Sequence, residues 1–348
     1  MAGFKGRGAA DNRAGRFQSW IREPEQPRAE EGGKPATTVT LQRARSIITR
    51  NSSPDVPFEQ SINPYQGCEH GCSYCFARPS HAYLDLSPGL DFETRLFVKE
   101  NAAALLREEL SRPGYRCQPI ALGTNTDPYQ PVERRHGITR ALLEVMREFR
   151  QPVGIVTKSA LVERDIDLLA PMASERLAQV FFSITSLDAD LSRRLEPRAS
   201  APYRRLEALQ RLSEAGIPCG VIVAPVIPML TDLHVERVLQ AAAVAGALMG
   251  GYVLLRLPHE VKGLFKDWLE RHYPLKARHV LSRLRDMRGG REYDSAWGAR
   301  MRGDGEYARL LEARFQTACR RAGLSESGRY ALETDRFRAP RTDQPSLF

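Results

Sequence analysis

The sequence predicts an α/β fold built around a parallel β-sheet, and two patterns support that prediction. Short apolar runs rich in β-branched residues alternate along the chain with segments in which apolar residues recur at helical spacing. The apolar runs are continuous, which is typical of strands that are covered on both faces. Strands that alternate with helices favour right-handed βαβ units and a parallel sheet. Six such units form either a partial barrel or an open doubly wound sheet, and periodicity does not distinguish the two.

The strands and helices are expected to follow one another in a regular order. The six strands are predicted at residues 60–66, 118–123, 152–157, 179–185, 219–225 and 251–257. The helices are predicted in the intervals, at residues 101–110, 139–149, 160–169, 202–215 and 232–248. Leu142, Leu143 and Met146 illustrate the helical spacing, and Gly216 is a stop signal after the fourth of these helices.

The two ends of the chain differ in composition from the middle, and the sequence predicts three regions. Residues 1–50 are rich in Gly, Pro, Glu and Arg and are expected to be extended or disordered and flexible, apart from a short edge strand at Thr38–Leu41. Residues 51–258 carry the βα units. Residues 259–348 predict a helical extension packed on the sheet, with helices at 264–271, 276–288 and 307–322.

Both ends of the chain are basic. The net charge of +9 divides into +5 for residues 1–50, −2 for residues 51–258 and +6 for residues 259–348. Basic flanks suit a polyanionic partner such as nucleic acid, and they equally suit the solvated surface of an arginine-rich protein. Residues 283–294 and 297–305 mix Arg, aromatic and Gly residues, which suits phosphate contacts and base stacking as well as a basic helix face and loop.

Three of the six cysteines form the motif C-x3-C-x2-C at Cys68, Cys72 and Cys75, just after the first predicted strand. Thiolates are soft ligands that suit iron–sulfur clusters or zinc. A zinc site commonly takes a second pair of Cys or His ligands, and no such pair follows. A cubane cluster has four irons, so three thiolates leave one iron for a ligand from outside the protein. The scattered Cys117, Cys219 and Cys319 are typical of buried small residues.

The motif resembles that of the radical SAM superfamily, in which an aromatic residue, here Tyr74, precedes the last cysteine. The resemblance covers about residues 55–260 and implies a partial (βα)6 barrel of the TIM type, which decides between the two sheet arrangements. It implies that Cys68, Cys72 and Cys75 bind a [4Fe–4S] cluster, with S-adenosylmethionine (SAM) on the fourth iron. In that family, one electron cleaves SAM to methionine and a 5′-deoxyadenosyl radical, which abstracts hydrogen from the substrate.

Within the superfamily, the chain is most similar to the spore-photoproduct-lyase-like group, also labelled DNA-repair photolyases. The segments that carry this resemblance are residues 67–76, 123–133, 156–159, 183–186, 195–198 and 224–232. Phe76 departs from the pattern, because those lyases have an aromatic residue with a hydroxyl at that place. The hydrogen-donor cysteine of the lyases has no matching motif either, which leaves Cys219 and Cys319 as candidates by elimination. Both departures weaken the case for thymine-dimer repair.

Side chains at the carboxyl ends of the strands are the expected cofactor contacts, because functional residues of parallel barrels lie there. Thr124, Asn125 and Asp127 follow the second strand and suit the amino group of SAM, although Asn and Asp are also common in turns. Lys158 follows the third strand and suits a carboxylate, with a solvated loop lysine as the alternative.

Two further segments continue this series. Ser183 and Thr185 end the fourth strand and are expected near the ribose hydroxyls of SAM. Arg198 lies on the next loop, where it suits the SAM carboxylate or an ion pair with Glu196. Tyr74, inside the cluster motif, completes the set of expected cofactor contacts.

Three classes of function fit these features. The first is a radical enzyme that acts on nucleic acid, by lesion repair or base modification, and the second is a radical enzyme that acts on a small molecule, peptide or protein. Either would need a reducing partner of the flavodoxin or ferredoxin type. The third is a non-catalytic iron–sulfur binding or sensor protein, against which the open iron argues. The sequence has neither a run of about 18 apolar residues nor a secretory signal, so we expect a cytoplasmic protein without a membrane span.

Overall fold

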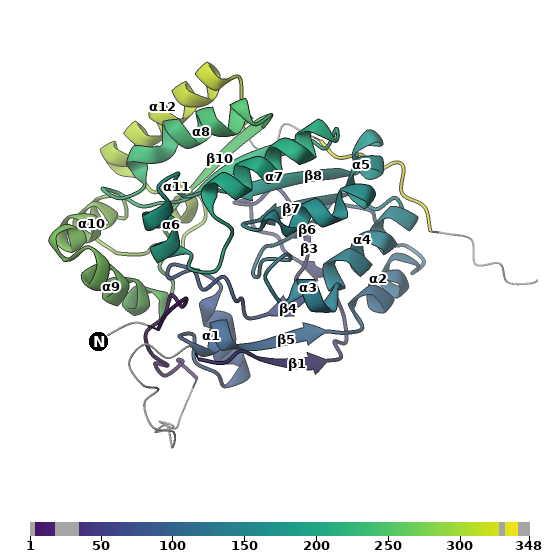
Figure 1. Cartoon of the computed structure of the whole chain (residues 1–348), viewed down its shortest axis with the longest axis horizontal. Coiled ribbons are helices and arrows are strands. Elements are labelled where there is room, and N and C mark those ends of the chain that lie inside the picture. Colours follow the sequence, from purple (N-terminus) through teal and green to yellow (C-terminus); the bar gives the residue numbers. More distant parts are fainter. Residues whose placement is uncertain (1–3, 18–34, 327–330, 340–348) are drawn as a thin grey trace, which may run out of the picture.

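Six parallel strands form the centre of one eight-stranded sheet in the computed structural model, which describes residues 4–17, 35–326 and 331–339 (Figure 1). Each strand pairs with the next one along the chain, and all six point the same way. The six are β3 (Gln60–Ile62), β6 (Ile120–Leu122), β7 (Val153–Thr157), β8 (Ala178–Ser183), β9 (Cys219–Val226) and β10 (Met249–Leu254).

This strand order confirms a partial barrel rather than a doubly wound sheet, in which the order reverses at a switch point. Two short strands extend its edges: β2 (Thr49–Arg50) lies antiparallel to β3, and β11 (Ser325–Glu326) lies parallel to β10. The two edges are not paired with each other among the described strands, so the barrel is open on one side.

Helices cover the outside of the sheet and follow the strands as the periodicity predicts. In α4 (Ile138–Glu148), for example, Leu142, Leu143 and Met146 are fully buried against the sheet. The other helices between strands are α1 (Asp91–Thr94), α2 (Ala102–Leu110), α3 (Glu133–His136), α5 (Ile166–Ser174), α6 (Ala189–Leu195), α7 (Pro202–Glu214) and α8 (Val235–Val244), with 3-10 turns η1 (Arg78–Leu84), η2 (Ala160–Asp165) and η3 (Asp232–His234).

A second, three-stranded sheet lies beside the barrel and carries the cysteine loop. Its order is β1 (Thr38–Gln42), β5 (Arg95–Lys99) and β4 (Tyr65–Gln66), and β1 confirms the short edge strand expected at Thr38–Leu41. The single strand predicted at 60–66 is therefore two, because Asn63 and Pro64 separate β3 from β4 and each half joins a different sheet.

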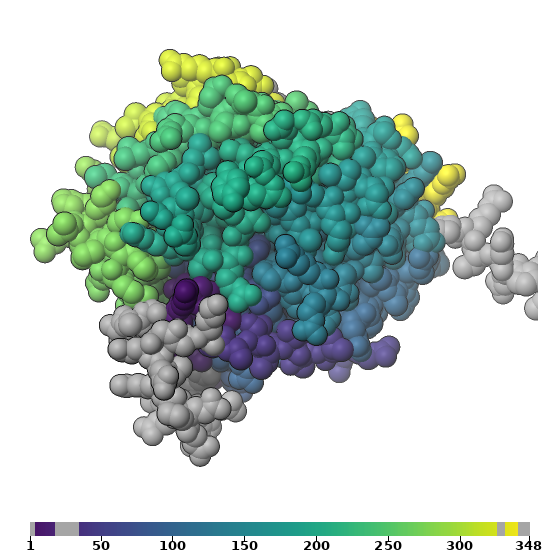
Figure 2. Space-filling view, in the orientation of Figure 1, coloured from purple at the N-terminus to yellow at the C-terminus, as the bar shows by residue number. Residues whose placement is uncertain are grey.

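The amino-terminal residues 4–17 form no regular element, yet they are packed on the body of the protein. Ala9 is buried, and its backbone N–H donates to the Glu93 carboxylate over 2.9 Å. Arg16 pairs with Glu260, close to the start of α9. Figure 2 shows these residues in purple, pressed against the helical extension. Residues 4–17 are thus irregular but packed, whereas residues 1–3 and 18–34 of the segment predicted at 1–50 lie outside the described residues.

The carboxyl-terminal extension is helical, as predicted. It contains α9 (Val261–His272), α10 (Pro274–Asp286), α11 (Ala299–Arg302) and α12 (Gly305–Ala322). Beyond β11, Phe337 packs against Tyr115 and Phe149, with ring centres 5.2 and 6.4 Å away. Among the residues that the structure describes, no helix combines the length and the apolar character of a membrane span.

Candidate cluster and cofactor site

The three motif cysteines lie on one loop that begins directly after β4. The Cys68 N–H donates to the Phe92 carbonyl over 2.8 Å. The amide of Gln130, a fully buried residue, donates to the Gly67 carbonyl and accepts the Glu69 N–H, at 3.1 and 2.9 Å. Gln130, which lies on the segment after β6, therefore fixes the start of the cysteine loop.

A buried ion pair supports the same loop from its other side. Arg78 and Glu93 are both fully buried and paired, and Arg78 Nε donates to the Cys72 carbonyl over 2.9 Å. Arg78 also donates to the carbonyls of Pro88 and Gly89, and Glu93 accepts the N–H groups of residues 8 and 9. Buried charges with all their hydrogen bonds made are held in one geometry, so this pair fixes the path of the loop.

The environment of the cysteines fits a cationic iron–sulfur cluster better than free thiolates. Cys68 and Cys72 are buried and Cys75 is half-buried. Burial raises the pKa of Cys68 well above its usual value and that of Cys72 to about 12. Thiolates would form here only with added positive charge, which bound iron brings. Among the described residues, no three Cys, His, Asp or Glu side chains converge on a single ion; a cubane needs no such convergence, because each thiolate binds a different iron.

A buried carboxylate, Glu196, organises the polar groups next to Cys72. It accepts the hydroxyl of Tyr74 and pairs with Arg205, whose side chain is 1% exposed. Thr185 Oγ1 lies 2.9 Å from Glu196 Oε1 and 2.8 Å from the Ala224 carbonyl at the end of β9. Glu196 thus ties the cysteine loop to the ends of strands β8 and β9.

Lys158 brings a positive charge to this group. Its Nζ lies 6.0 Å from the centre of the Tyr74 ring. Burial by itself would lower the pKa of Lys158, but the neighbouring Cys72 and Glu196 raise it above its usual value. The lysine is therefore charged at neutral pH, and its ammonium is suited to a carboxylate ligand beside the cysteines.

Asp127 is the anchor of the loop that follows β6. Burial alone would raise its pKa, but His70, at 3.4 Å, and hydrogen bonds from Lys158 N and Thr157 Oγ1, both 2.7 Å long, lower it to about 2. It also accepts the Tyr129 N–H over 2.9 Å. Asp127 is thus turned toward the protein and connects the cysteine loop, through His70, to the end of β7.

Asn63 holds the other part of that loop and was not found from the sequence. Its Oδ1 accepts the N–H groups of Asn125 and Thr126, at 2.9 and 3.3 Å, and its Nδ2 donates to Thr124 Oγ1 over 3.0 Å. The Asn125 side chain remains exposed. The sequence placed Asn63 inside a strand at 60–66, whereas it directly follows β3, at a strand end where functional residues of a parallel barrel lie.

The remaining expected contacts are engaged with the protein itself. Ser183 is buried, with Oγ 3.2 Å from the Ala224 carbonyl. Arg198 pairs with Glu69 over 2.8 Å, whereas Glu196, the partner considered from the sequence, pairs with Arg205. Because Glu69 is itself part of the cysteine loop, Arg198 connects that loop to the segment after α6.

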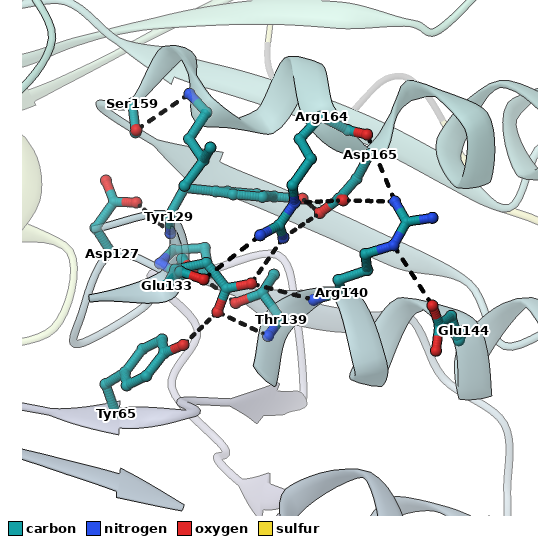
Figure 3. A network of polar contacts seen from close by, with 12 residues as sticks. Tyr65, Asp127, Tyr129, Glu133, Thr139, Arg140, Glu144, Ser159, Arg164 and Asp165 are labelled. Carbon is teal, nitrogen blue, oxygen red and sulfur yellow. Dashed lines mark hydrogen bonds and ion pairs between the residues drawn. The ribbon is translucent and has the colours of Figure 1, made fainter. Parts of the chain in front are cut away.

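Figure 3 shows a further polar network behind the loop after β6, which the sequence did not reveal. Glu133 is fully buried and accepts hydrogen bonds from Tyr65, Thr139 and Arg164. Asp165, also fully buried, accepts from Tyr129, Arg140 and Arg164. The network locks η2 to the turn at residues 127–133, and so fixes the loop that carries Asn125 and Asp127.

The two cysteines considered as hydrogen donors lie away from these groups. Cys219 is the first residue of β9 and is fully buried. Cys319 is on α12 and reaches Gly250, the second residue of β10, where an added Cβ would lie 3.1 Å from its sulfur. Both are thus at the amino ends of the strands, opposite the cysteine loop.

Comparison with known proteins agrees with this architecture. The sequence profile of the Radical SAM superfamily matches residues 62–242. An uncharacterized protein of Mycobacterium tuberculosis is 41% identical over 234 residues, which cover 67% of this chain and 68% of that protein. An uncharacterized protein of Methanocaldococcus jannaschii is 29% identical over 214 residues, covering 61% of this chain and 76% of the relative.

Solved structures share the same fold. Spore photoproduct lyase complexed with dinucleoside spore photoproduct superposes with a TM-score of 0.60 at 18% identity, over 88% of this chain and 87% of the lyase. A variant of the lyase with bound AdoMet and dinucleoside spore photoproduct superposes with a TM-score of 0.59 at 17% identity, over 85% and 82% of the two chains. The family match spans more than half of the chain and includes all three motif cysteines. The chain therefore belongs to the radical SAM superfamily, as an enzyme with the fold of spore photoproduct lyase.

Proposed function

We propose that Cys68, Cys72 and Cys75 bind a [4Fe–4S] cluster and that SAM binds its fourth iron. The observation that carries this proposal is the buried three-cysteine loop beside the charged Lys158. When bound, the cluster and SAM supply a 5′-deoxyadenosyl radical, formed together with methionine by one-electron cleavage of SAM. The residues of the chain then have three tasks, which are to hold the cluster, to orient SAM and to exclude water.

The contacts divide the neighbouring residues into two groups. The first group is proposed to contact SAM. In it, Lys158 binds the SAM carboxylate, Thr124 and Asn125 bind the amino group, and Ser183 binds the ribose. The other group is proposed to position the site, because each of its members binds a buried ionisable side chain, which is Glu196, His70 or Glu69. Its members are Tyr74, Asp127, Thr185 and Arg198.

The test is the release of 5′-deoxyadenosine by anaerobically reconstituted protein given dithionite and SAM. We expect product from the wild type and none from Cys72→Ala, because loss of one thiolate removes an iron ligand. Cys219→Ala is the matched control, since Cys219 is also buried but lies at the amino end of β9, away from the cysteine loop. This variant should still bind iron and release 5′-deoxyadenosine. A reconstituted wild type that releases no 5′-deoxyadenosine would favour a structural or sensor role for the cluster.

Lys158→Gln tests the assigned carboxylate contact. Removing the ammonium should weaken SAM binding about tenfold, a loss of about 1.4 kcal/mol, because one charge-assisted hydrogen bond is lost. Lys158→Arg should restore part of the affinity. Equilibrium binding of SAM to the reconstituted protein measures this, and unchanged binding in Lys158→Gln would remove the lysine from the SAM site.

For the substrate, we propose nucleic acid, with lesion repair or base modification as the reaction. The basic ends of the chain support this, and so does the arginine-rich segment between α10 and α12, whose Arg288 and Met301 contact Leu255 and Arg256 just beyond β10. A reducing protein of the flavodoxin or ferredoxin type is proposed as the electron donor. Binding to oligonucleotides should fall steeply with salt; if no binding occurs at low salt, a small molecule, peptide or protein becomes the better substrate.

A further inference from the structure

Arg256 lies just beyond β10 and next to the cysteine loop. Its guanidinium carbon is 4.7 Å from the centre of the ring of Phe76, the residue that follows Cys75. One Nη of Arg256 lies 3.6 Å from the Met301 sulfur, which is a weak acceptor. Its Nε is buried and has no hydrogen-bond partner among the described residues. Arg256 therefore carries a charge at the strand end with donors left unused.

Arg288 approaches the same strand end from the segment after α10. It is only 4% exposed, and its Nη2 donates to the Leu255 carbonyl over 2.7 Å. Its Nε and Nη1 are buried without a hydrogen-bond partner among the described residues. A buried donor left unpaired is destabilising, so a buried guanidinium with two such donors is arranged for an acceptor from outside the chain.

Asp55 lies near Arg256 and Asp294 lies near Arg288, but each carboxylate is bound elsewhere. Neither arginine forms an ion pair with a described carboxylate. Asp55 pairs with Arg300 and accepts the Gly298 N–H, and Asp294 accepts the Ala296 N–H over 2.8 Å. Burial, and then the nearby Arg256, lower the pKa of Arg288, and Tyr293 and Asp294 offset this only in part, so a bound anion would relieve both lowering effects. The centre of the Tyr293 ring lies 5.8 Å from the Arg288 guanidinium carbon.

We propose that Arg256 and Arg288 bind a phosphate group of the substrate, with Phe76 and Tyr293 as flanking rings for a base. This inference rests on the proposed function, because it assigns the substrate class of the same site. Guanidinium groups match phosphate oxygens in a bidentate geometry, and aromatic rings stack on bases of any sequence. Since Phe76 is adjacent to Cys75, a nucleotide held here lies beside the proposed cluster. The phosphate comes from either a free nucleotide or a nucleic acid strand.

The experiment uses the reconstituted full chain and a fluorescein-labelled oligothymidylate, followed by fluorescence anisotropy under anaerobic conditions. Arg256→Gln and Arg288→Gln should each weaken oligothymidylate binding about tenfold. Each should also make the fall of affinity with salt less steep, by the amount expected for the loss of about one phosphate contact. Arg278→Gln is the matched control, because it removes the same charge from an exposed position on α10 and should change binding less than about twofold. Unlabelled thymidine 5′-monophosphate separates the two sources, since effective competition by it indicates a free nucleotide and weak competition indicates a strand.

Several results would overturn the proposal. One is that the wild type binds neither probe, and another is that the three substitutions have equal effects. A third is that Arg256→Gln loses affinity for SAM but keeps its affinity for oligothymidylate. Arg288 is buried, so its variant can fail to fold; the half-buried Arg256 then decides the result, with iron content and SAM binding as the check on folding. Oligothymidylate binding together with no release of 5′-deoxyadenosine would contradict the proposed function and leave the phosphate site intact.

Discussion

Glu196 stands between two cations, Arg205 and Lys158, and both it and Arg205 are buried. Burial alone would raise the pKa of Glu196, but those two cations and the Tyr74 hydroxyl lower it below its usual value. We expect Glu196→Gln to lower the free energy of unfolding by about 3–5 kcal/mol, because it leaves a buried arginine without its counter-charge. Chemical denaturation at neutral pH measures the loss.

Glu207→Gln is the control for this change, since Glu207 makes the same kind of pair with Arg204 on the exposed face of α7. An exposed pair of this type contributes about 0.3–0.5 kcal/mol, so the control should stay close to the wild type. Similar losses in the two variants would show that Arg205 is stabilised mainly by the carbonyls of Ser183 and Ser200.

At the scale of single residues, the sequence identified the side chains at strand ends but not what holds them. The spacing of the three cysteines and the position of Lys158 could be read directly. Asn63, Gln130 and Arg205 could not, because each acts through a residue more than twenty positions away or through a carbonyl, and no local pattern records such contacts. The ion pair of Arg198 with Glu196, one of the two partners considered from the sequence, is wrong for the same reason, because Arg198 pairs with Glu69.

Among the elements, the loop with the three cysteines depends on a glycine with little room around it. Gly71 has a φ of +67°, and an added Cβ would lie 2.7 Å from a carboxylate oxygen of Glu93, which is buried and paired. We expect Gly71→Ala to displace the loop and to lower the iron bound after reconstitution by several-fold. Iron content per chain and the visible absorbance of the cluster measure it.

Gly216→Ala separates backbone strain from crowding. Gly216 has a φ of +79°, and nothing lies within 4 Å of an added Cβ. The strain of an L-residue in the left-handed region costs about 1–2 kcal/mol at either position. The Gly216 variant should therefore be slightly less stable yet retain its iron, and loss of iron from both variants would mean that strain alone explains the effect.

The sequence predicted the elements well where hydrophobic periodicity is strong. Strands β6 to β9 and helices α2, α4 and α7 begin within two residues of their expected positions. Strand β5 and helix α6 were not predicted because both are short. The alternation of β5 extends over only Arg95–Lys99, and α6 is less than two full helical turns long. The division of residues 60–66 between two sheets is a tertiary property that a single apolar run does not encode.

For the molecule as a whole, the amino-terminal segment closes one side of the proposed cluster site. Gly8 packs directly on Gly71, because an added Cβ at Gly8 would lie 1.8 Å from the Gly71 carbonyl oxygen. Arg7 binds the carbonyls of Glu93 and Pro35, and Arg13 pairs with Asp267 on α9. Residues 7–13 thus connect the cysteine loop to the carboxyl-terminal extension, which composition alone did not suggest.

We therefore expect the amino-terminal segment to shield the bound cluster from oxygen. Gly8→Ala should lift the segment off the cysteine loop, because the new methyl group and the Gly71 carbonyl cannot occupy the same space. The reconstituted cluster should then lose its visible absorbance in air several-fold faster than in the wild type. Gly6→Ala is the control: Gly6 is two residues away and nothing lies within 4 Å of an added Cβ there. Equal bleaching of the two variants and the wild type would mean that the loop and its buried Arg78–Glu93 pair protect the cluster without the segment.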